Sequence, residues 1–177
     1  MTATRTARHD VRQLTHVTEA EISDLAHVLI DCVDGGASVN FMLPLALTKA
    51  TEYWRGVARD VANGTRVLLV AEDESGIVGT VQVVHAQPEN QPHRADISKM
   101  LVHRRARRRG LGAALMRAAE DCARAAGKTL LVLDTASSDA ERLYERLGWT
   151  RVGVIPDYAL WPQGGTCAAS FYYRKLD

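Results

Sequence analysis

Apolar residues along the chain switch several times between the spacing of a helix and that of a strand. Where they recur every three or four positions they predict a helix with one buried face, and short β-branched runs between turn residues predict strands. The predicted helices cover residues 22–33, 48–62, 111–126 and 139–147. The predicted strands cover residues 12–17, 67–71, 77–84, 95–102, 130–134, 150–155 and 169–175. This succession predicts a mixed α/β fold.

Local signals mark the ends of several of these elements. The segment Thr-Glu-Ala-Glu at residues 18–21 has the pattern of a capping box, in which a hydroxyl and a carboxylate each serve a free backbone N–H group. A glycine follows each predicted helix within two residues, as is common where helices end. Residues 73–76, Asp-Glu-Ser-Gly, predict a turn, so the strands on either side of it form a hairpin.

The order of the predicted elements defines a sheet topology. The hairpin is followed by a strand, a helix and another strand, and such a strand–helix–strand unit implies a right-handed parallel crossover. We therefore expect a mixed, mostly antiparallel sheet with a central parallel strand pair and helices on both faces. The chain contains no internal repeat or interdomain linker. Residues 12–177 are predicted to form a single domain, preceded by a disordered N-terminal tail at residues 1–11.

Composition narrows the class of protein only a little. Of 177 residues, 46% are hydrophobic and 24% are charged, which is ordinary for a globular domain, and the net charge of +1 favours no particular partner. The three cysteines have no metal-ligand or disulfide-framework spacing, which is typical of reduced thiols in the cytoplasm. No apolar run approaches the roughly 20 residues that span a bilayer, and no secretory signal pattern is present. We therefore expect a cytoplasmic protein with no metal and no membrane partner.

The most informative stretch is the arginine- and glycine-rich segment at residues 104–112, between a predicted strand and a predicted helix. Gly110 and Gly112 allow the backbone to approach a ligand closely. The first N–H groups of the following helix are unpaired and lie at the positive end of its dipole, and this combination binds a pyrophosphate. The spacing fits neither a Walker A loop nor a Rossmann glycine motif. The segment therefore predicts a phosphate-binding turn of another kind.

Two other interpretations of this segment stay open. Its five arginines within six positions, from Arg104 to Arg109, could form a solvated turn or could bind a nucleic acid. No aromatic-rich RNA-binding signature accompanies them, and the near-zero net charge counts against a nucleic-acid partner. We therefore expect no nucleic-acid partner and keep nucleic-acid binding as the less favoured alternative.

Two motifs together resemble those of the GNAT superfamily of acetyltransferases. The first is Arg-x-x-Gly-x-Gly at residues 107–112, after a strand that ends in Met-Leu-Val; the second is the segment 140–149, in which Leu143 replaces a common aromatic residue. The resemblance implies the GNAT fold, acetyl-CoA as the cofactor, and Tyr144 as the acid that protonates the departing thiolate. The cofactor-binding residues that it implies are Met100, Leu101, Val102, Arg107, Arg108, Arg109, Gly110, Leu111, Gly112 and Ala113.

Two aspartates are candidates for the base that deprotonates an amine acceptor, because only a neutral amine can attack a thioester. Asp96 lies six residues before Val102, a distance of about 20 Å along a strand and close to the length of a pantetheine arm. Asp134 closes an apolar strand at the carboxyl end of the sheet, where ligands bind, although it could instead cap the next helix. The sequence leaves open which of the two is the principal base.

Lys99 is an awkward feature of the strand that precedes the phosphate-binding turn. In strict alternation Asp96, Ser98, Met100 and Val102 share one face, which places Lys99 among apolar residues on the other. A β-bulge near residues 98–100 would relieve this conflict. It would also free a backbone N–H near Met100 for the thioester oxygen.

The segment 34–42 joins the first two predicted helices. Together with residues 90–96 and 133–135 it resembles, within the superfamily, the tabtoxin-resistance acetyltransferases, and the similarity extends over residues 14–176. The resemblance implies that this loop covers the acceptor and that Asp96 and Asp134 act as bases. The substrate-binding residues that it implies are Gly35, Gly36, Ser38 and Phe41. The alternative is an ordinary connection between helices, with Phe41 in the core.

The sequence therefore predicts an acetyl-CoA-dependent N-acetyltransferase. We expect direct transfer, in a ternary complex, to the primary amine of a small molecule, either an amino-acid-like compound or a toxin, with a role in resistance. The other candidate function is a non-catalytic module that binds acyl-CoA. The oligomeric state stays open, and a homodimer that exchanges C-terminal strands is compatible with the sequence.

Overall fold

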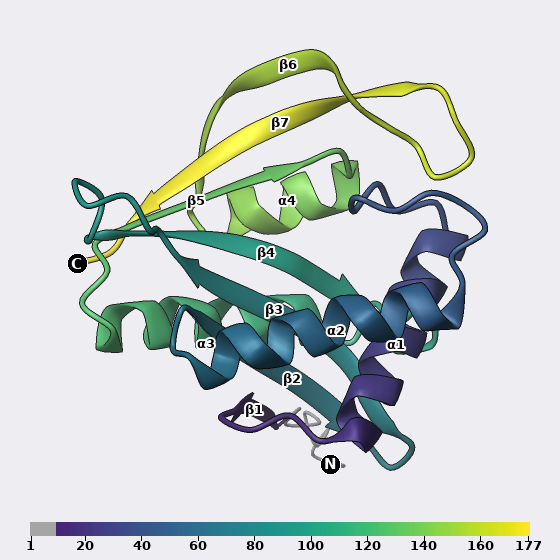
Figure 1. The fold of residues 1–177 in the computed structure, drawn as a ribbon. Coiled ribbons are helices and arrows are strands. Elements are labelled where there is room, and N and C mark those ends of the chain that lie inside the picture. The colour runs from purple at the N-terminus through teal and green to yellow at the C-terminus, as the bar shows by residue number, and fades with distance from the viewer. Residues whose placement is uncertain (1–9) are drawn as a thin grey trace, which may run out of the picture.

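The computed structural model of the protein describes residues 10–177, and its elements alternate much as the sequence predicts (Figure 1). The strands are β1 (Val11–Leu14), β2 (Arg66–Asp73), β3 (Gly76–His85), β4 (Arg94–Val102), β5 (Leu130–Thr135), β6 (Thr150–Leu160) and β7 (Thr166–Lys175). The helices are α1 (Glu19–Asp34), α2 (Leu47–Ala62), α3 (Leu111–Ala125) and α4 (Ser138–Arg146), with a 3-10 turn at Arg104–Ala106. Residues 1–9 of the predicted tail lie outside the described residues, and Val11 already belongs to β1.

The start of α1 follows directly from its sequence. Thr18 is the N-cap, and its hydroxyl accepts a hydrogen bond from the Glu21 backbone N–H at 3.3 Å. In return the Glu21 carboxylate accepts from the Thr18 backbone N–H at 2.8 Å. The predicted capping box is therefore confirmed, and an ion pair between Glu21 and Arg12 ties the helix start to β1.

The seven strands form one sheet in the order β1-β2-β3-β4-β5-β7-β6. β4 and β5 pair in parallel, whereas all other neighbours pair antiparallel. α1 and α2 cover one face of the sheet and α3 covers the other (Figure 1). The predicted mixed sheet with a central parallel strand pair and helices on both faces is thus confirmed.

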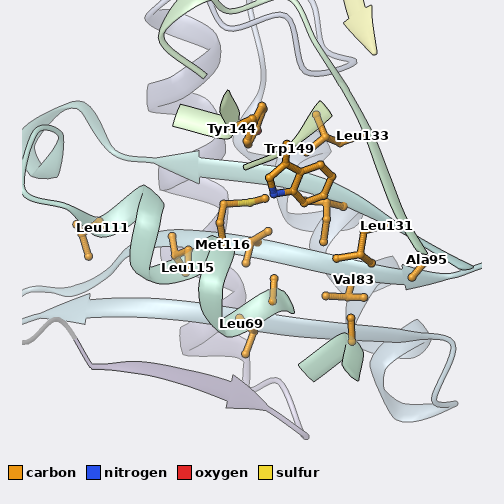
Figure 2. Close-up of a cluster of buried hydrophobic side chains, with 14 of the residues drawn as sticks. Leu69, Val83, Ala95, Leu111, Leu115, Met116, Leu131, Leu133, Tyr144 and Trp149 are labelled. Carbon is orange, nitrogen blue, oxygen red and sulfur yellow. The ribbon is translucent and has the colours of Figure 1, made fainter. Parts of the chain in front are cut away.

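The sheet separates two apolar cores, one under α3 and one under α1 and α2. On β2, Leu69 and Ala71 belong to the α3 core, whereas Leu68 and Val70 belong to the α1–α2 core. Successive side chains of a strand point to opposite faces, so a strand covered on both sides is apolar at every position. Figure 2 shows the α3 core, which extends from the helix across the sheet to Trp149.

A β-bulge in β4 changes the face to which its side chains point. The register between β3 and β4 shifts by one residue around Lys99, whose φ is 50°. Ile97, before the shift, belongs to the α3 core, whereas Leu101, after it, belongs to the α1–α2 core. The predicted bulge is therefore confirmed. Because of it, Asp96 and Met100 lie on opposite faces of the strand and not on the shared face of strict alternation.

The parallel strand pair opens toward its carboxyl ends. β4 and β5 are paired only over Arg94–Asp96 and Leu130–Val132; beyond this, β4 stays paired with β3 and β5 with β7. Figure 1 shows the two strands diverging toward the loop that joins α1 and α2. This divergence leaves the ends of β4 and β5 free to face each other across a cleft.

The C-terminal hairpin is longer than the sequence predicts. β6 extends to Leu160 instead of Ile155, and β7 begins at Thr166 instead of Ala169. β6 is the edge strand of the sheet, and two register shifts interrupt its pairing with β7, one of them around Pro156. These irregularities remove the alternation on which a strand prediction depends, so the end of the strand was not visible in the sequence.

Candidate active site

A cleft of about 720 Å³ opens between the diverging ends of β4 and β5. It is lined by the α1–α2 loop, the second half of β4, the start of α3, the end of β5 and part of α4. Its volume lies within the range of sites that hold cofactors and small ligands. Its place at the carboxyl ends of two parallel strands is where open α/β sheets bind ligands.

The N-terminus of α3 forms one end of the cleft. Gly110 is the N-cap, in the left-handed conformation with a φ of 82°, and no side chain caps the helix. The first backbone N–H groups of α3 precede the first intrahelical bond, which Ala114 donates to the Gly110 carbonyl. Gly112 lies so close to α4 that a Cβ there would be 3.0 Å from Leu143. The turn is therefore a bare helix terminus, the arrangement that binds phosphate groups.

Most of the arginines around this turn are held by contacts within the protein. Arg104 and Arg105 form ion pairs with aspartates of α1 and β2. Arg107 donates from Nε to the Val102 carbonyl at 2.9 Å and so braces the turn against β4. Arg108 is highly exposed and lies 3.9 Å from a carboxylate of α4. Charges that are paired in this way do not form the open basic stripe that is typical of nucleic-acid-binding surfaces.

Two groups of opposite charge are among the residues that line the cleft: Asp134, near the end of β5, and Lys99, at the β4 bulge. Partial desolvation raises the pKa of the Asp134 carboxyl, and the positive charge of Lys99 opposes this shift. Desolvation lowers the pKa of the Lys99 ammonium from 10.5 to about 8, and the negative charge of Asp134 opposes that shift in turn. The surroundings thus disfavour both charges, and the cleft is lined by two proton-binding groups with shifted pKa values.

The sequence alone did not assign Lys99 to the site. Its Nζ donates a hydrogen bond to Oδ1 of Asn40, in the α1–α2 loop, at 2.6 Å. It also lies 5.8 Å from the centre of the Tyr53 ring. The sequence contained a signal, because a lysine among apolar positions of a strand indicates a bulge or a site. Its contact with Asn40, which also lines the cleft, joins it to a loop 59 residues earlier, and no local pattern shows such a contact.

Replacement of Lys99 by methionine is expected to stabilise the free protein at neutral pH, because it removes a desolvated charge and keeps the length of the side chain. The melting temperature should rise by a few degrees, about 2–4 °C for each kcal/mol gained at this chain length. The gain should shrink as the pH rises above about 8, where native Lys99 loses its proton before the unfolded chain does. Calorimetry at neutral pH and at about pH 9 measures both effects, and a lower melting temperature at neutral pH would contradict the prediction.

Tyr144 of α4 is the third group of chemical interest. Its side chain packs in the α3 core, with its ring centre 6.0 Å from that of Trp149 and 5.9 Å from that of Tyr172 (Figure 2 shows the first contact). It also lines the cleft. Burial raises the pKa of the phenol above its ordinary value, and the charge of Asp134 adds to the effect. The hydroxyl therefore stays protonated and is suited to donate a proton.

The α1–α2 loop closes one side of the cleft and is tied to the C-terminal hairpin. The Ser38 hydroxyl donates to the Leu160 carbonyl at 2.8 Å, across 122 residues of sequence. The Leu43 N–H donates to the Pro162 carbonyl at 2.9 Å. Trp161, between these two acceptors, lines the cleft. This side of the cleft is thus built by segments that lie far apart in the sequence.

Most of the residues predicted from the sequence meet in this cleft. They are Gly35, Gly36, Ser38, Met100, Leu101, Val102, Arg107, Arg108, Gly110, Leu111, Gly112, Ala113, Asp134 and Tyr144. Asp96, Phe41 and Arg109 are not among the lining residues. Asp96 lies before the bulge and pairs with Arg94 at 3.0 Å. Phe41 is buried in the α1–α2 core, as the alternative interpretation of that loop holds.

Metal ligands, cysteine thiols and membrane-spanning helices are features that indicate other kinds of functional site. Within residues 10–177 no group of His, Cys, Asp and Glu side chains is arranged to hold a metal ion. Cys32, Cys122 and Cys167 are free thiols. None of the helices in this part of the chain is long and apolar enough to span a membrane.

The amino-acid sequence is similar to that of a known protein over most of its length. The family described as the acetyltransferase (GNAT) domain matches residues 64–151, a span that contains Gly110, Asp134 and Tyr144. A protein described as an uncharacterized N-acetyltransferase in the hisH-hisA intergenic region of Azospirillum brasilense is 28% identical over 160 residues. That similarity covers 88% of this chain and 94% of the relative.

Solved structures share the fold. The GNAT superfamily phosphinothricin acetyltransferase of Sinorhizobium meliloti, in complex with acetyl-CoA, aligns with a TM-score of 0.79 at 19% identity, over 95% of this chain and 88% of that one. An N-acetyltransferase from Staphylococcus aureus Mu50 aligns with a TM-score of 0.78 at 14% identity, over 95% and 99%. The chain is thus similar in sequence to the acetyltransferase (GNAT) domain over residues 64–151, and it shares the fold of these solved acetyltransferases.

Proposed function

We propose that the protein is an acetyl-CoA-dependent N-acetyltransferase that acetylates the primary amine of a small molecule. The observation that carries the proposal is that a bare helix N-terminus, Asp134 and Tyr144 come together in one cleft. Transfer of an acetyl group from a thioester to an amine needs a place for the cofactor phosphates, a base for the amine and an acid for the leaving thiolate. The cleft offers a group for each of these roles.

The start of α3 fits the pyrophosphate of coenzyme A. Gly110 carries no side chain that would cap the helix, so its first N–H groups stay available to an anion. Arg108, which is 89% exposed, adds a mobile positive charge. Met100 and Val102 line the cleft along β4 and could flank the pantetheine arm. When bound, acetyl-CoA supplies the activated thioester.

Asp134 is the stronger candidate for the base. It lines the cleft and its pKa is raised, which improves its ability to take a proton from an ammonium group. Asp96 is engaged with Arg94 and is not a lining residue. In the proposed reaction Asp134 takes a proton from the ammonium group, and the neutral amine then forms the C–N bond. The nitrogen loses its second proton to solvent as the C–S bond breaks.

Tyr144 and the β4 bulge complete the proposed chemistry. Tyr144 gives its phenolic proton to the departing sulfur and is restored by solvent. Lys99 and Met100 have no register partner on β3, because the bulge interrupts the ladder there. A backbone N–H at this point can donate to the thioester oxygen as negative charge develops on it.

The first test is amine-dependent release of thiol from acetyl-CoA, measured with a chromogenic thiol reagent. We expect release with the wild-type protein, and we expect kcat/KM to fall at low pH as Asp134 becomes protonated. Asp134→Asn should lower kcat/KM by about 100-fold or more, the usual contribution of a general base.

Asp96→Asn is the matched control, since it neutralises the other candidate on the adjacent strand. It should retain most of the activity. A larger loss in Asp96→Asn than in Asp134→Asn would reverse the assignment. Binding of acetyl-CoA without release of thiol for any amine would contradict the proposal in favour of a non-catalytic acyl-CoA-binding module.

Three further observations support proposals on the acceptor, the cellular location and the oligomeric state. The resemblance to tabtoxin-resistance acetyltransferases supports an amino-acid-like or toxin acceptor and a role in resistance. The free cysteines favour action in the cytoplasm. β6 exposes Val152 (70%), Ile155 (46%) and Tyr158 (49%) along an edge strand, which supports a homodimer formed through the C-terminal hairpin.

A further inference from the structure

We infer that Lys99 binds an acidic group of the acceptor, so that the preferred acceptor carries an oxyanion, such as a carboxylate, together with its amine. The inference rests on the proposed function, because it names a feature of the molecule that the cleft acetylates. It adds a fourth role to the site: Asp134 is the base, Tyr144 is the acid, the start of α3 binds the cofactor, and Lys99 selects the acceptor.

The position of Lys99 is held by unusual backbone geometry. Four non-glycine residues of the described chain have a positive φ, and three of these, Asn40, Lys99 and Arg108, line the cleft. Such conformations are unfavourable for residues with a Cβ and gather at functional sites. Two of the three, Asn40 at 76° and Lys99 at 50°, are joined by the hydrogen bond between their side chains. The contact that holds the ammonium group thus joins two residues in left-handed backbone conformations, of which that of Lys99 is the less favourable for its residue type.

The charge of Lys99 lacks a carboxylate partner. In the described part of the chain its Nζ has a neutral amide oxygen at 2.6 Å and the face of Tyr53 at 5.8 Å, but no ion pair. A desolvated cation without an ion-pair partner is unfavourable: desolvation and the positive charge of Arg66 lower its pKa, against the opposing charge of Asp134. The ammonium carries three N–H donors and gives one of them to Asn40. The others remain for an anion that enters the cleft.

The distribution of charge in the cleft matches a zwitterion. Asp134 and Lys99 are close enough to affect each other's pKa, yet they do not form an ion pair. An acceptor with an ammonium and an oxyanion would place its ammonium at Asp134, where the proton is to be removed, and its oxyanion at Lys99. Each protein charge would then be compensated, and the acceptor would be oriented with its amine toward the base.

The experiment compares acids with matched uncharged acceptors. The probes are the proteinogenic L-amino acids and their carboxamides, which keep the amine and the side chain, with taurine and aminomethylphosphonate as other oxyanions. Acetylation is followed as thiol release. Binding to the CoA-saturated protein is followed by ligand-observed NMR, which does not depend on turnover.

We expect the best acid to exceed its amide by about tenfold or more in kcat/KM and in affinity, as for a hydrogen bond to a charged group. Lys99→Met should reduce this preference to about threefold or less. Lys49→Met is the matched control: Lys49 also lies over an aromatic ring, at 5.9 Å from the Phe41 centroid, but it is exposed and outside the cleft. The preference should survive in this variant.

Three results would overturn the inference: equal use of acids and amides by the wild type, an unchanged preference in Lys99→Met, or the absence of binding by every acid. A loss in Lys99→Met that is equal for acids and amides and shifts the pH profile would instead make Lys99 a base. These results are distinct from failure of the proposed function. Acetylation without preference for acids refutes only the role of Lys99, whereas selective binding of acids without acetylation refutes only the transfer.

Discussion

Substitution of Tyr144 by phenylalanine should lower the rate of acetyl transfer by about 100-fold or more, the usual contribution of a general acid. The change removes only the phenolic hydroxyl, which is protonated at neutral pH and becomes still harder to ionise because burial raises its pKa. The ring keeps its packing against Trp149 and Tyr172, so the fold should persist. Single-turnover measurement of thiol release reports the chemical step directly, and the Kd of acetyl-CoA should change by less than about threefold.

Tyr172→Phe is the matched control for this experiment. Tyr172 is buried beside Tyr144, but its hydroxyl donates to Glu145 at 3.0 Å and does not line the cleft. Loss of that hydrogen bond should cost about 1 kcal/mol of stability and leave the rate nearly unchanged. If Tyr144→Phe keeps more than about a third of the wild-type rate, the leaving thiolate does not take its proton from Tyr144.

Substitution of Gly110 by valine should abolish measurable binding of acetyl-CoA, with a loss of affinity of at least about 50-fold. Gly110 holds the helix N-cap at a φ of 82°, a conformation that a β-branched residue strongly disfavours. The turn would shift away from this geometry, and the N–H groups at the start of α3 would no longer point together at the phosphates. Isothermal titration with acetyl-CoA measures the effect.

Gly127→Val separates this effect from general destabilisation. Gly127 follows the other end of α3 and has a φ of 71°, and, as at Gly110, no heavy atom lies within 4 Å of the position that a Cβ would take. Both variants should lose stability to a similar extent, about 1–3 kcal/mol. Gly127→Val should bind acetyl-CoA as the wild type does. Equal losses of affinity in the two variants would show that the turn at Gly110 has no specific role.

Local pattern was sufficient to identify most of the elements and one half of the site. The capping box at Thr18 and Glu21 requires only residues three positions apart. The phosphate-binding turn is likewise contained in a short segment that ends at Gly112, because a strand end, a glycine turn and a helix start follow one another in the chain. Such features were predictable since neighbours in sequence are neighbours in space.

The bulge at Lys99 shows where a local argument ends. The sequence indicated an irregularity near residues 98–100, because strict alternation left a lysine among apolar positions. It did not show that the shift would turn Asp96 away from the face of Met100 and leave it paired with Arg94. The direction of each side chain depends on how β4 pairs with β3, and pairing is a property of the sheet.

The amino-acid sequence by itself determined the mixed α/β fold, the turn at Gly110 and the candidate Asp134, because periodicity and short-range spacing encode them. The candidate Tyr144 came from the resemblance of segment 140–149 to a GNAT motif. The tertiary structure decided which of these groups share a cleft. The β4–β5 pair separates after three residues, and the α1–α2 loop is fixed by hydrogen bonds to the C-terminal hairpin. The contact between Lys99 and Asn40 likewise joins two segments, β4 and the α1–α2 loop, that are far apart in the sequence. Contacts over such separations depend on the packing of the whole chain, and no pattern within a single segment records them.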